Sequence, residues 1–325
     1  MNHARTIRSL PRHARPGFTL VELLFSIGII FLLMAIAIVA MAKVNRSSRR
    51  VAQRQAVVAI RFGVDQFQSQ FGFLPPIIDD GDPLRMSGSV QVPNVIRFEG
   101  LDPGDSGDAV LIDFWRGEGP HPSGLAGDHR FSTRSLAFYL AGALDADDGQ
   151  GNPVDGVTGP GFLTPRRDGS FGRSSGTKRT GDTIEPFIEV DRNIQVFRDP
   201  SDDSRLELRD ANGTAFRFYR WRTGSQTSDP AAIRNAGDYN VPKVFGDADR
   251  DGDSDYSAAE DDTRFRSARY VILAAGPNGV FGDVPADGGT GTETIAQLAE
   301  ALGRTGDPTA LIAAARKDNV MEVGR

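Results

Sequence analysis

Acidic residues at alternate positions are the clearest chemical feature of this sequence. The segment D-A-D-R-D-G-D-S-D, which starts at Asp247, offers a carboxylate at every second residue and a glycine for a sharp turn. Calcium takes roughly six to eight hard oxygen ligands, and a loop of this pattern can supply them. Without a cation the carboxylates would repel one another, so we predict a calcium-binding loop, with a solvated acidic loop as the alternative. The predicted ligands are Asp247, Asp249, Asp251, Asp253, Asp255 and Glu260.

Glu22 is a second group of interest because its surroundings are apolar. It interrupts an apolar run from Phe18 to Ala42, and it is the only charged residue within that run. The uncharged part of this run is about 20 residues and about 30 Å long as a helix, which matches the hydrocarbon core of a membrane. A carboxylate in such a segment costs about 2.5–3.5 kcal/mol on insertion scales and is a functional residue by default. We therefore expect Glu22 to pair with a cationic group.

A short basic leader precedes the apolar run. It carries arginines at positions 5, 8, 12 and 15 and no acidic residue. Arginines are retained on the cytoplasmic side, so the leader predicts a single-pass protein whose remaining chain is exported. Two alternatives stay open: a secretory signal that is cleaved after Ala40-Met41-Ala42, and a plain membrane anchor with an incidental acid.

The order of these features resembles the type IV pilin and pseudopilin family. The resemblance rests on the basic leader, the octet G-F-T-L-V-E-L-L from Gly17, and the long apolar run. It implies that a prepilin peptidase cleaves after Gly17 and methylates the new N-terminus at Phe18. Glu22 would then be the fifth residue of the mature chain and would lie near the terminal amine of a neighbouring subunit. That pairing would offset the desolvation of both charges and set the register of one helix against the next.

The composition limits what the exported part can do. The chain has 325 residues, of which 39% are hydrophobic, and it contains no cysteine. This excludes disulfide bonds and thiol catalysis, so stability must come from packing or from bound metal. Loss of the four leader arginines would change the net charge from −6 to −10. Such an acidic domain is unsuited to binding nucleic acid.

Motifs for catalysis are weak. His121 and His129 are the only histidines after the leader, and isolated surface histidines are more common than metal sites. The stretch Gly172–Gly176 fits G-x-S-x-G, but a nucleophile elbow requires a strand before it and a helix after it. The residues that follow, Lys178–Gly181, are typical of a loop. We therefore predict that the chain is not an enzyme.

A long N-terminal helix is predicted from the apolar residues that follow the membrane run. They recur at intervals of three and four and form one stripe of a helix. The Pro75-Pro76 pair then ends the pattern. We expect a single helix from Phe18 to about Phe71, with a break near Asn45–Ser48 as the alternative. The stripe consists of Val57, Ile60, Val64, Phe67 and Phe71.

The remaining pattern predicts an α+β fold, because helices and strands do not alternate as in β-α-β units. We expect a long N-terminal transmembrane and amphipathic helix packed on an antiparallel sheet, with loop-rich insertions. The predicted segments are a leader (1–17), a transmembrane and polymerisation helix (18–42), its amphipathic continuation (43–74) and an exported head (75–325). The head should contain helices at Phe131–Leu144, at Thr290–Leu302 with Thr290 and Glu293 as a capping box, and at Pro308–Arg316 with Asp307 as the cap. It should also contain strands at Phe187–Val190, Ala215–Trp221 and Tyr270–Ala274, and a turn at Asn212-Gly213.

One C-terminal segment resembles a particular member of the pilin and pseudopilin family. The residues Y-V-I-L-A-A-G-P-N-G, from Tyr270, are similar to the last long strand and glycine-rich calcium loop of the major pseudopilin of type II secretion. This resemblance implies a second calcium position that uses Asn278 and Asp318. It also implies that residues 283–316 are an insertion within the loop.

The resemblance implies a structural subunit of a type II secretion-like system that polymerises into a periplasmic pseudopilus. Its partners would be further copies, other pseudopilins, the prepilin peptidase, an inner-membrane assembly platform and the lipid bilayer, but not nucleic acid. It would span the inner membrane once, with a cytoplasmic N-terminus and a periplasmic head. Two other functions stay open. One is a pilin or minor pilin of a type IV pilus, in adhesion, motility or DNA uptake, and the other is an anchored exported domain of different function.

Overall fold

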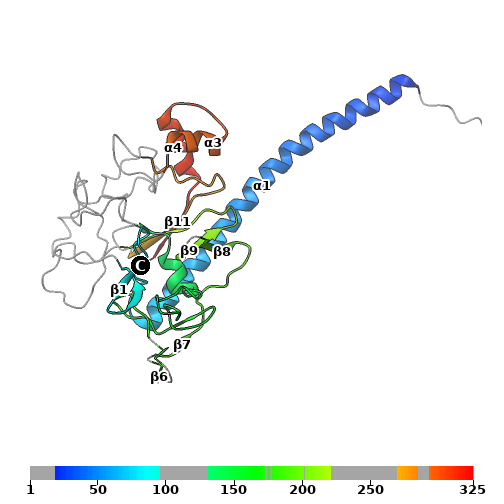
Figure 1. Cartoon of the computed structure of the whole chain (residues 1–325). Coiled ribbons are helices and arrows are strands. Elements are labelled where there is room, and N and C mark those ends of the chain that lie inside the picture. The colour runs from blue at the N-terminus through cyan, green and yellow to red at the C-terminus, as the bar shows by residue number, and fades with distance from the viewer. Residues whose placement is uncertain are drawn as a thin grey trace, which may run out of the picture. The chain divides into compact units, whose positions relative to one another are not determined.

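The computed structural model describes residues 19–95, 131–172, 174–175, 178–179, 181–200, 202–220, 269–284 and 293–324. The chain divides into two compact units, Met1–Ser47 and Ser48–Arg325. Figure 1 labels the helices and strands along the chain. An apolar N-terminal helix is combined with antiparallel sheets, which confirms the predicted α+β fold class.

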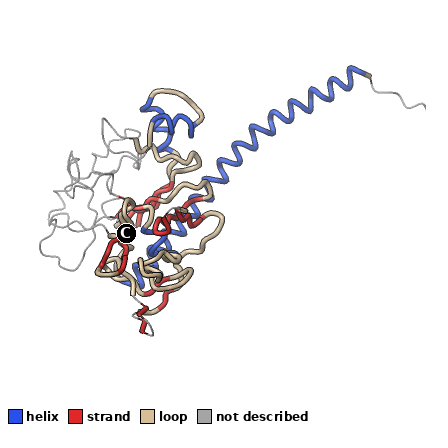
Figure 2. Tube along the Cα trace, in the orientation of Figure 1, coloured by secondary structure: helices blue, strands red, loops and turns tan. Residues whose placement is uncertain are grey.

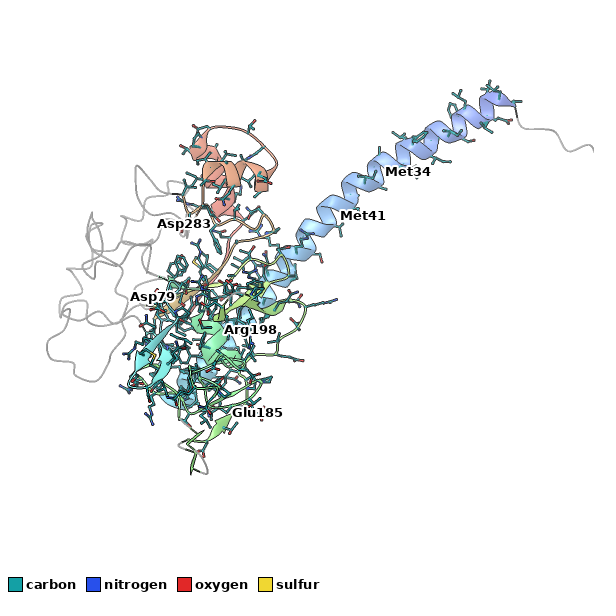
Figure 3. The ribbon with its side chains drawn as sticks, viewed as in Figure 1. Met34, Met41, Asp79, Glu185, Arg198 and Asp283 are labelled. Atoms are coloured by element: carbon teal, nitrogen blue, oxygen red, sulfur yellow. The ribbon has the colours of Figure 1, made fainter. Side chains whose placement is uncertain are left out.

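Helix α1 extends from Leu20 to Phe71 and contributes to both units. It has no interruption at Asn45–Ser48, so the prediction of a single helix is confirmed. In the first unit, the segment Leu20–Ile38 is long and apolar enough to cross a membrane, and none of it is buried. Exposed side chains surround the part of α1 that belongs to the first unit, among them Met34 and Met41 (Figure 3).

In the second unit, α1 presents the apolar stripe that the sequence predicts. Val57, Ile60 and Val64 are completely buried there. The helix ends at Phe71, and Gly72 follows with a positive φ of 77°, a conformation that favours glycine. The end of the helix is therefore set by this glycine and by the proline pair that follows, as expected.

The second unit contains a four-stranded antiparallel sheet with the strand order β12–β11–β10–β3. Figure 2 shows the strands of the chain in red. All five residues of β11 are buried, as expected for a short apolar run between two other strands. The strand predicted at Tyr270–Ala274 is confirmed, and β10 lies within the predicted strand Ala215–Trp221. The strands are β3 (Phe131–Ser132), β10 (Arg217–Arg220), β11 (Tyr270–Ala274) and β12 (Val320–Gly324).

Polar contacts join α1 to this sheet. The Tyr270 hydroxyl donates a hydrogen bond to the Asp65 carboxylate, and the Arg61 guanidinium lies 3.1 Å from the Glu322 carboxylate of β12. Gly324 is paired with Tyr270 across the two strands, and a Cβ at Gly324 would lie 2.0 Å from the tyrosine ring. Glycine at this position therefore leaves the space through which the ring reaches the helix.

The second unit also contains four separate two-stranded antiparallel sheets within the residues described. The predicted turn at Asn212-Gly213 is confirmed and follows strand β9 (Asp202–Asp210). Gly213 has a positive φ of 83°, and a β-bridge between Arg209 and Ala215 closes the turn. The pairs are β1 (Leu84–Ser87) with β2 (Val90–Pro93), β4 (Phe162–Leu163) with β7 (Thr183–Ile184), β5 (Ser174–Ser175) with β6 (Lys178–Arg179), and β8 (Ile194–Asp199) with β9 (Asp202–Asp210).

The helix predicted at Phe131–Leu144 is confirmed only in its middle part. The first two residues form the edge strand β3 instead, and the chain is helical over residues 135–141, of which Ala137–Ala141 form a π-helix, η1. Pairing of Phe131 and Ser132 with β10 outweighs the helical spacing of the leucines in this segment. The π-helix is completely enclosed by the core, so its backbone conformation follows from packing.

The strand predicted at Phe187–Val190 is also wrong, because this segment forms no ladder. It packs instead against α1 at Gly63, where a Cβ would lie 2.8 Å from the Ile188 side chain. Contact with a helix has replaced the sheet pairing that the apolar residues suggested.

Helices α3 (Ile295–Leu302) and α4 (Pro308–Lys317) follow β11 and precede β12 in the sequence, and they pack against each other (Figure 1). They share a small core of their own around Leu298 and Leu311. The predicted start of α4 at Asp307 is confirmed. The predicted capping box of the preceding helix is wrong, because Thr294 and Gln297 form it. Glu293 instead accepts hydrogen bonds from the loop amides of Phe281 and Asp283.

Candidate assembly site and calcium loops

Glu22 lies in the first turn of α1, where it is exposed and hydrogen-bonded to Thr19. The backbone amide and the hydroxyl of Thr19 both donate to Glu22 Oε2 at 3.0 Å, and the Glu22 amide donates back to Thr19 Oγ1 at 3.2 Å. This is a capping box, in which two helix-terminal donors are satisfied reciprocally. The spacing T-x-x-E could have been recognised in the sequence, although only the charge of Glu22 was interpreted there. Within the described residues, these bonds use a single carboxylate oxygen.

The predicted processing residues, Gly17 and Phe18, lie outside the described residues. The described residues begin directly after them, at Thr19, and helix α1 begins at Leu20. Large apolar side chains of the first unit are exposed on every face of α1, including Leu20 at 79% and Phe25 at 70%. An apolar surface of this extent is stable only when a bilayer or other helices cover it.

A second exposed apolar stripe lies on α1 in the other unit. Val51, Val58 and Phe62 follow one another at spacings of seven and four, and Phe62 is 62% exposed. This spacing keeps the three side chains on one face, opposite the buried stripe of the same helix. Only the structure shows which of the two stripes is buried, because the sequence contains apolar residues on both faces of the helix.

The acidic loop that carries the main calcium prediction lies outside the described residues. This applies to every predicted ligand from Asp247 to Asp255 and to Glu260. Calcium binding there stays a prediction.

The second predicted calcium position lies in the loop after β11, and the structure brings its two parts together. The Asn278 side-chain amide donates to the Ala315 carbonyl at 3.4 Å. A Cβ on Gly276 would lie 2.2 Å from the Asp318 carbonyl oxygen, which shows how closely the two chain segments approach. Gly276 also has a positive φ of 56°. The loop thus depends on glycine at this close approach.

Protein donors already bind the oxygen atoms of this loop. Asn278 Oδ1 accepts from the Val280 amide at 3.1 Å, and the Gly276 carbonyl accepts from the Gln53 side chain at 2.8 Å. Among the described residues, no group of three or more Asp, Glu, His or Cys is arranged to hold a metal ion. Calcium binding at Asn278 and Asp318 stays a prediction.

Further side-chain donors close the same loop. The Asn319 amide donates to the Phe281 carbonyl at 3.0 Å, and Arg316 Nε donates to the Gly282 carbonyl at 3.1 Å. The buried Arg217 guanidinium lies 2.8 Å from the Asp283 carboxylate and 3.9 Å from the centre of the Phe281 ring. These contacts give the loop a set of internal cross-links that need no cation.

Asp155 is a buried titratable residue that nothing in the sequence singled out. Its carboxylate accepts hydrogen bonds from the amides of Ala143 at 2.6 Å and Val157 at 3.0 Å, and the residue is completely inaccessible. Burial raises the pKa of Asp155 to about 7, and the nearby Asp145 adds to this effect. The sequence could not reveal this environment because the enclosing residues come from several loops.

We expect Asp155 to make the stability of the second unit depend on pH. Its pKa is higher in the folded chain than the value of 3.8 for an ordinary aspartate, so folding favours the protonated form. This contribution to stability is complete below about pH 4 and is lost as the pH rises through about 7. The loss in the free energy of unfolding is about 4 kcal/mol. Denaturant unfolding of the full chain in detergent at pH 4.5 and pH 8 measures it.

Asp155→Asn should remove this component of the pH profile, whereas substitution of the exposed Asp82 by asparagine should leave it unchanged. The informative quantity is the difference between wild type and variant at each pH, because other carboxylates contribute to both curves equally. Parallel curves for wild type and Asp155→Asn would contradict the assignment.

Comparison with known families identifies one match. Residues 12–38 match the prokaryotic N-terminal methylation motif, so the match includes Gly17, Phe18, Glu22 and the apolar segment up to Ile38. The comparisons with curated proteins and with solved structures give no match. The motif supports a type IV pilin or pseudopilin family, which is a family of structural subunits. Together with the exposed apolar helix, it indicates a membrane-anchored protein.

Proposed function

We propose that the chain is a structural pseudopilin subunit of a type II secretion-like system. Prepilin peptidase would cleave it after Gly17 and methylate Phe18, and the mature chain would polymerise through α1 into a periplasmic fibre. The observation that carries this proposal is the coincidence of the methylation motif with a helix whose apolar side chains are exposed on all sides. The helix would lie in the inner membrane before assembly, with the head on the exported side.

Assembly would depend on the carboxylate at the start of the helix. In the mature chain, Phe18 would carry the terminal amine and Glu22 would follow four residues later. A neighbouring amine would approach the Glu22 oxygen that the capping box does not use. Pairing in an apolar environment is favourable only when both charges meet, so it selects one axial register between helices. The exposed stripe of Val51, Val58 and Phe62 would extend this contact toward the head.

Two features favour a secretion pseudopilus over a surface pilus. The segment that resembles the major pseudopilin forms strand β11 and the glycine turn at Gly276, as the resemblance implies. The 325 residues also contain no cysteine, whereas a cysteine pair in the head would favour a surface pilin. Other pseudopilins and an inner-membrane assembly platform would be its partners.

Mass spectrometry of the mature chain tests the proposed processing. We expect an N-terminal peptide that starts with monomethylated Phe18 when the protein is produced together with a prepilin peptidase. Without the peptidase, the chain should keep its first 17 residues. An N-terminus at Lys43 would instead indicate an ordinary secretory signal and would exclude assembly through α1.

We also propose that the acidic loop from Asp247 binds calcium and stabilises the head. A ligand at 100 times its Kd stabilises the folded state by about 2.7 kcal/mol, which corresponds to a rise in Tm of about 5–10 °C for a head of this size. Calcium should produce this rise and a chelator should reverse it. Asp249→Asn combined with Asp251→Asn should abolish the response, whereas substitution of the exposed Asp82 by asparagine should leave it intact. An unchanged Tm on chelation would contradict calcium binding.

A further inference from the structure

We propose that the basic segment directly after the membrane span binds the phosphate headgroups of anionic phospholipids on the exported side. This juxtamembrane basic segment contains Lys43, Arg46, Arg49, Arg50 and Arg54. The inference rests on the proposed function only in requiring that α1 is anchored in a bilayer.

The segment is distinguished by its charge. No acidic residue occurs between Glu22 and Asp65, although the mature chain as a whole would carry a net charge of −10 after loss of four arginines from −6. Five positive charges are thus concentrated next to an apolar span in an otherwise acidic protein. Soluble surfaces usually mix both signs, so a block of one sign indicates a partner of opposite charge.

The arginines of this segment whose side chains the structure describes form no ion pairs that would stabilise the fold. Arg49, Arg50 and Arg54 are exposed, and none forms an ion pair with another described residue. Arg61, further along the same helix, shows the contrast, because it is paired with Glu322 at 3.1 Å and Asp65 at 3.7 Å. The fold therefore neutralises the arginine that faces the sheet and leaves the preceding three available.

Their position along α1 suits lipid headgroups. At about 1.5 Å per residue, Arg46, Arg49 and Arg50 follow Ala42, the end of the uncharged apolar run, by about 6, 10 and 12 Å. The headgroup region extends roughly 5–8 Å beyond the hydrocarbon core, and long basic side chains bend back toward this interface. A guanidinium donates two parallel hydrogen bonds to phosphate, which makes arginine well suited to this ligand. Basic residues this close to a membrane attract anionic lipids.

A lipid partner also explains the distribution of charge after processing. Removal of the leader takes every basic residue from the cytoplasmic end, so only the exported end of the span remains basic. The segment would then hold the exported end of the membrane span at the headgroups in subunits that are not yet assembled. The alternative partner is the acidic head of a neighbouring subunit in the fibre.

Lipid enrichment around the segment tests the inference in the full mature chain. Since the chain has no cysteine, Ser48→Cys introduces a single site for a donor fluorophore. The labelled protein is reconstituted into vesicles of phosphatidylcholine with 30% phosphatidylglycerol, and energy transfer to a trace of acceptor-labelled lipid of either kind is compared. We expect phosphatidylglycerol to be enriched several-fold over phosphatidylcholine, and the enrichment to fall in 0.5 M NaCl.

The variant R49Q/R50Q/R54Q should lose most of this enrichment. The matched control R166Q/R192Q/R304Q removes three exposed arginines of the head and should keep it, although both variants have the same net charge. Equal transfer to both lipids in wild type, or equal enrichment in both variants, would overturn the inference. Loss of fibres in R49Q/R50Q/R54Q without lipid enrichment in wild type would assign the segment to a neighbouring head.

Flotation of the vesicles separates this inference from the proposed function. A chain that floats with both vesicle compositions but shows no phosphatidylglycerol enrichment contradicts only the lipid contact. A chain that floats with neither composition contradicts membrane anchoring, and with it both proposals.

Discussion

Glu22→Ala is expected to abolish incorporation into fibres while leaving the chain in the membrane. Without the carboxylate, the terminal amine of the neighbouring Phe18 would be buried among apolar helices without a counter-charge. Removing one partner of a buried ion pair costs about 3–5 kcal/mol, and this cost recurs at every subunit contact. Removal of a buried charge should not weaken insertion of the helix, because the carboxylate itself opposes insertion. Immunoblots of sheared fibre and membrane fractions measure the two effects.

The capping box supplies matched controls for this prediction. Glu22→Gln keeps a side chain that can cap the helix but removes the charge, so it should fail to assemble like Glu22→Ala. Thr19→Ala removes the hydrogen-bond partner of Glu22 but keeps the charge, so it should still assemble. If Glu22→Gln assembles normally and Thr19→Ala does not, helix capping and not charge pairing is the function of Glu22.

Gly142→Ala should destabilise the second unit by about 3–5 kcal/mol, which is a large part of the total stability of a typical domain. Gly142 follows the π-helix η1 with a positive φ of 101°, and a Cβ there would lie 2.2 Å from the backbone oxygen of Gly161. The neighbouring atom belongs to the backbone, so no flexible side chain can move aside. Denaturant unfolding of the full chain in detergent, followed by intrinsic fluorescence, measures the loss.

Gly151→Ala is the matched control for this substitution. Gly151 also has a positive φ, 82°, but a Cβ there would meet no atom within 4 Å. We therefore expect only the conformational cost of about 1–2 kcal/mol. Equal losses for the two variants would show that backbone conformation, and not the contact with Gly161, determines the stability at Gly142.

The elements that sequence patterns predicted correctly are those that depend on local signals. The apolar stripe of α1, the Asp307 cap of α4 and the apolar run of β11 each occupy one short stretch of chain. The period of a helix or the hydrogen bond of a cap is contained within such a stretch. Such elements can therefore be predicted without knowing which distant residues pack against them.

The predictions that are wrong concern segments whose conformation depends on distant partners. Leucines at helical spacing predicted a helix at Phe131–Leu144, but pairing with β10, far along the chain, converts its start into a strand. Thr290 and Glu293 had the spacing of a capping box, yet Glu293 binds the amides of the β11 loop instead. In both cases a contact between remote residues competes with the local preference and is favoured.

The features of the candidate site also fall into those that the sequence predicts and those that only the structure shows. The sequence by itself determined the basic leader, the position of the apolar span and the acid within it, because charge and hydropathy along one helix need no knowledge of neighbours. Only the tertiary structure decided that Asp155 is enclosed, that Gly142 faces Gly161, and that Gln53 of α1 donates to the Gly276 carbonyl. These features join residues that are remote in the chain, and burial and hydrogen bonding arise only when folding brings such residues together.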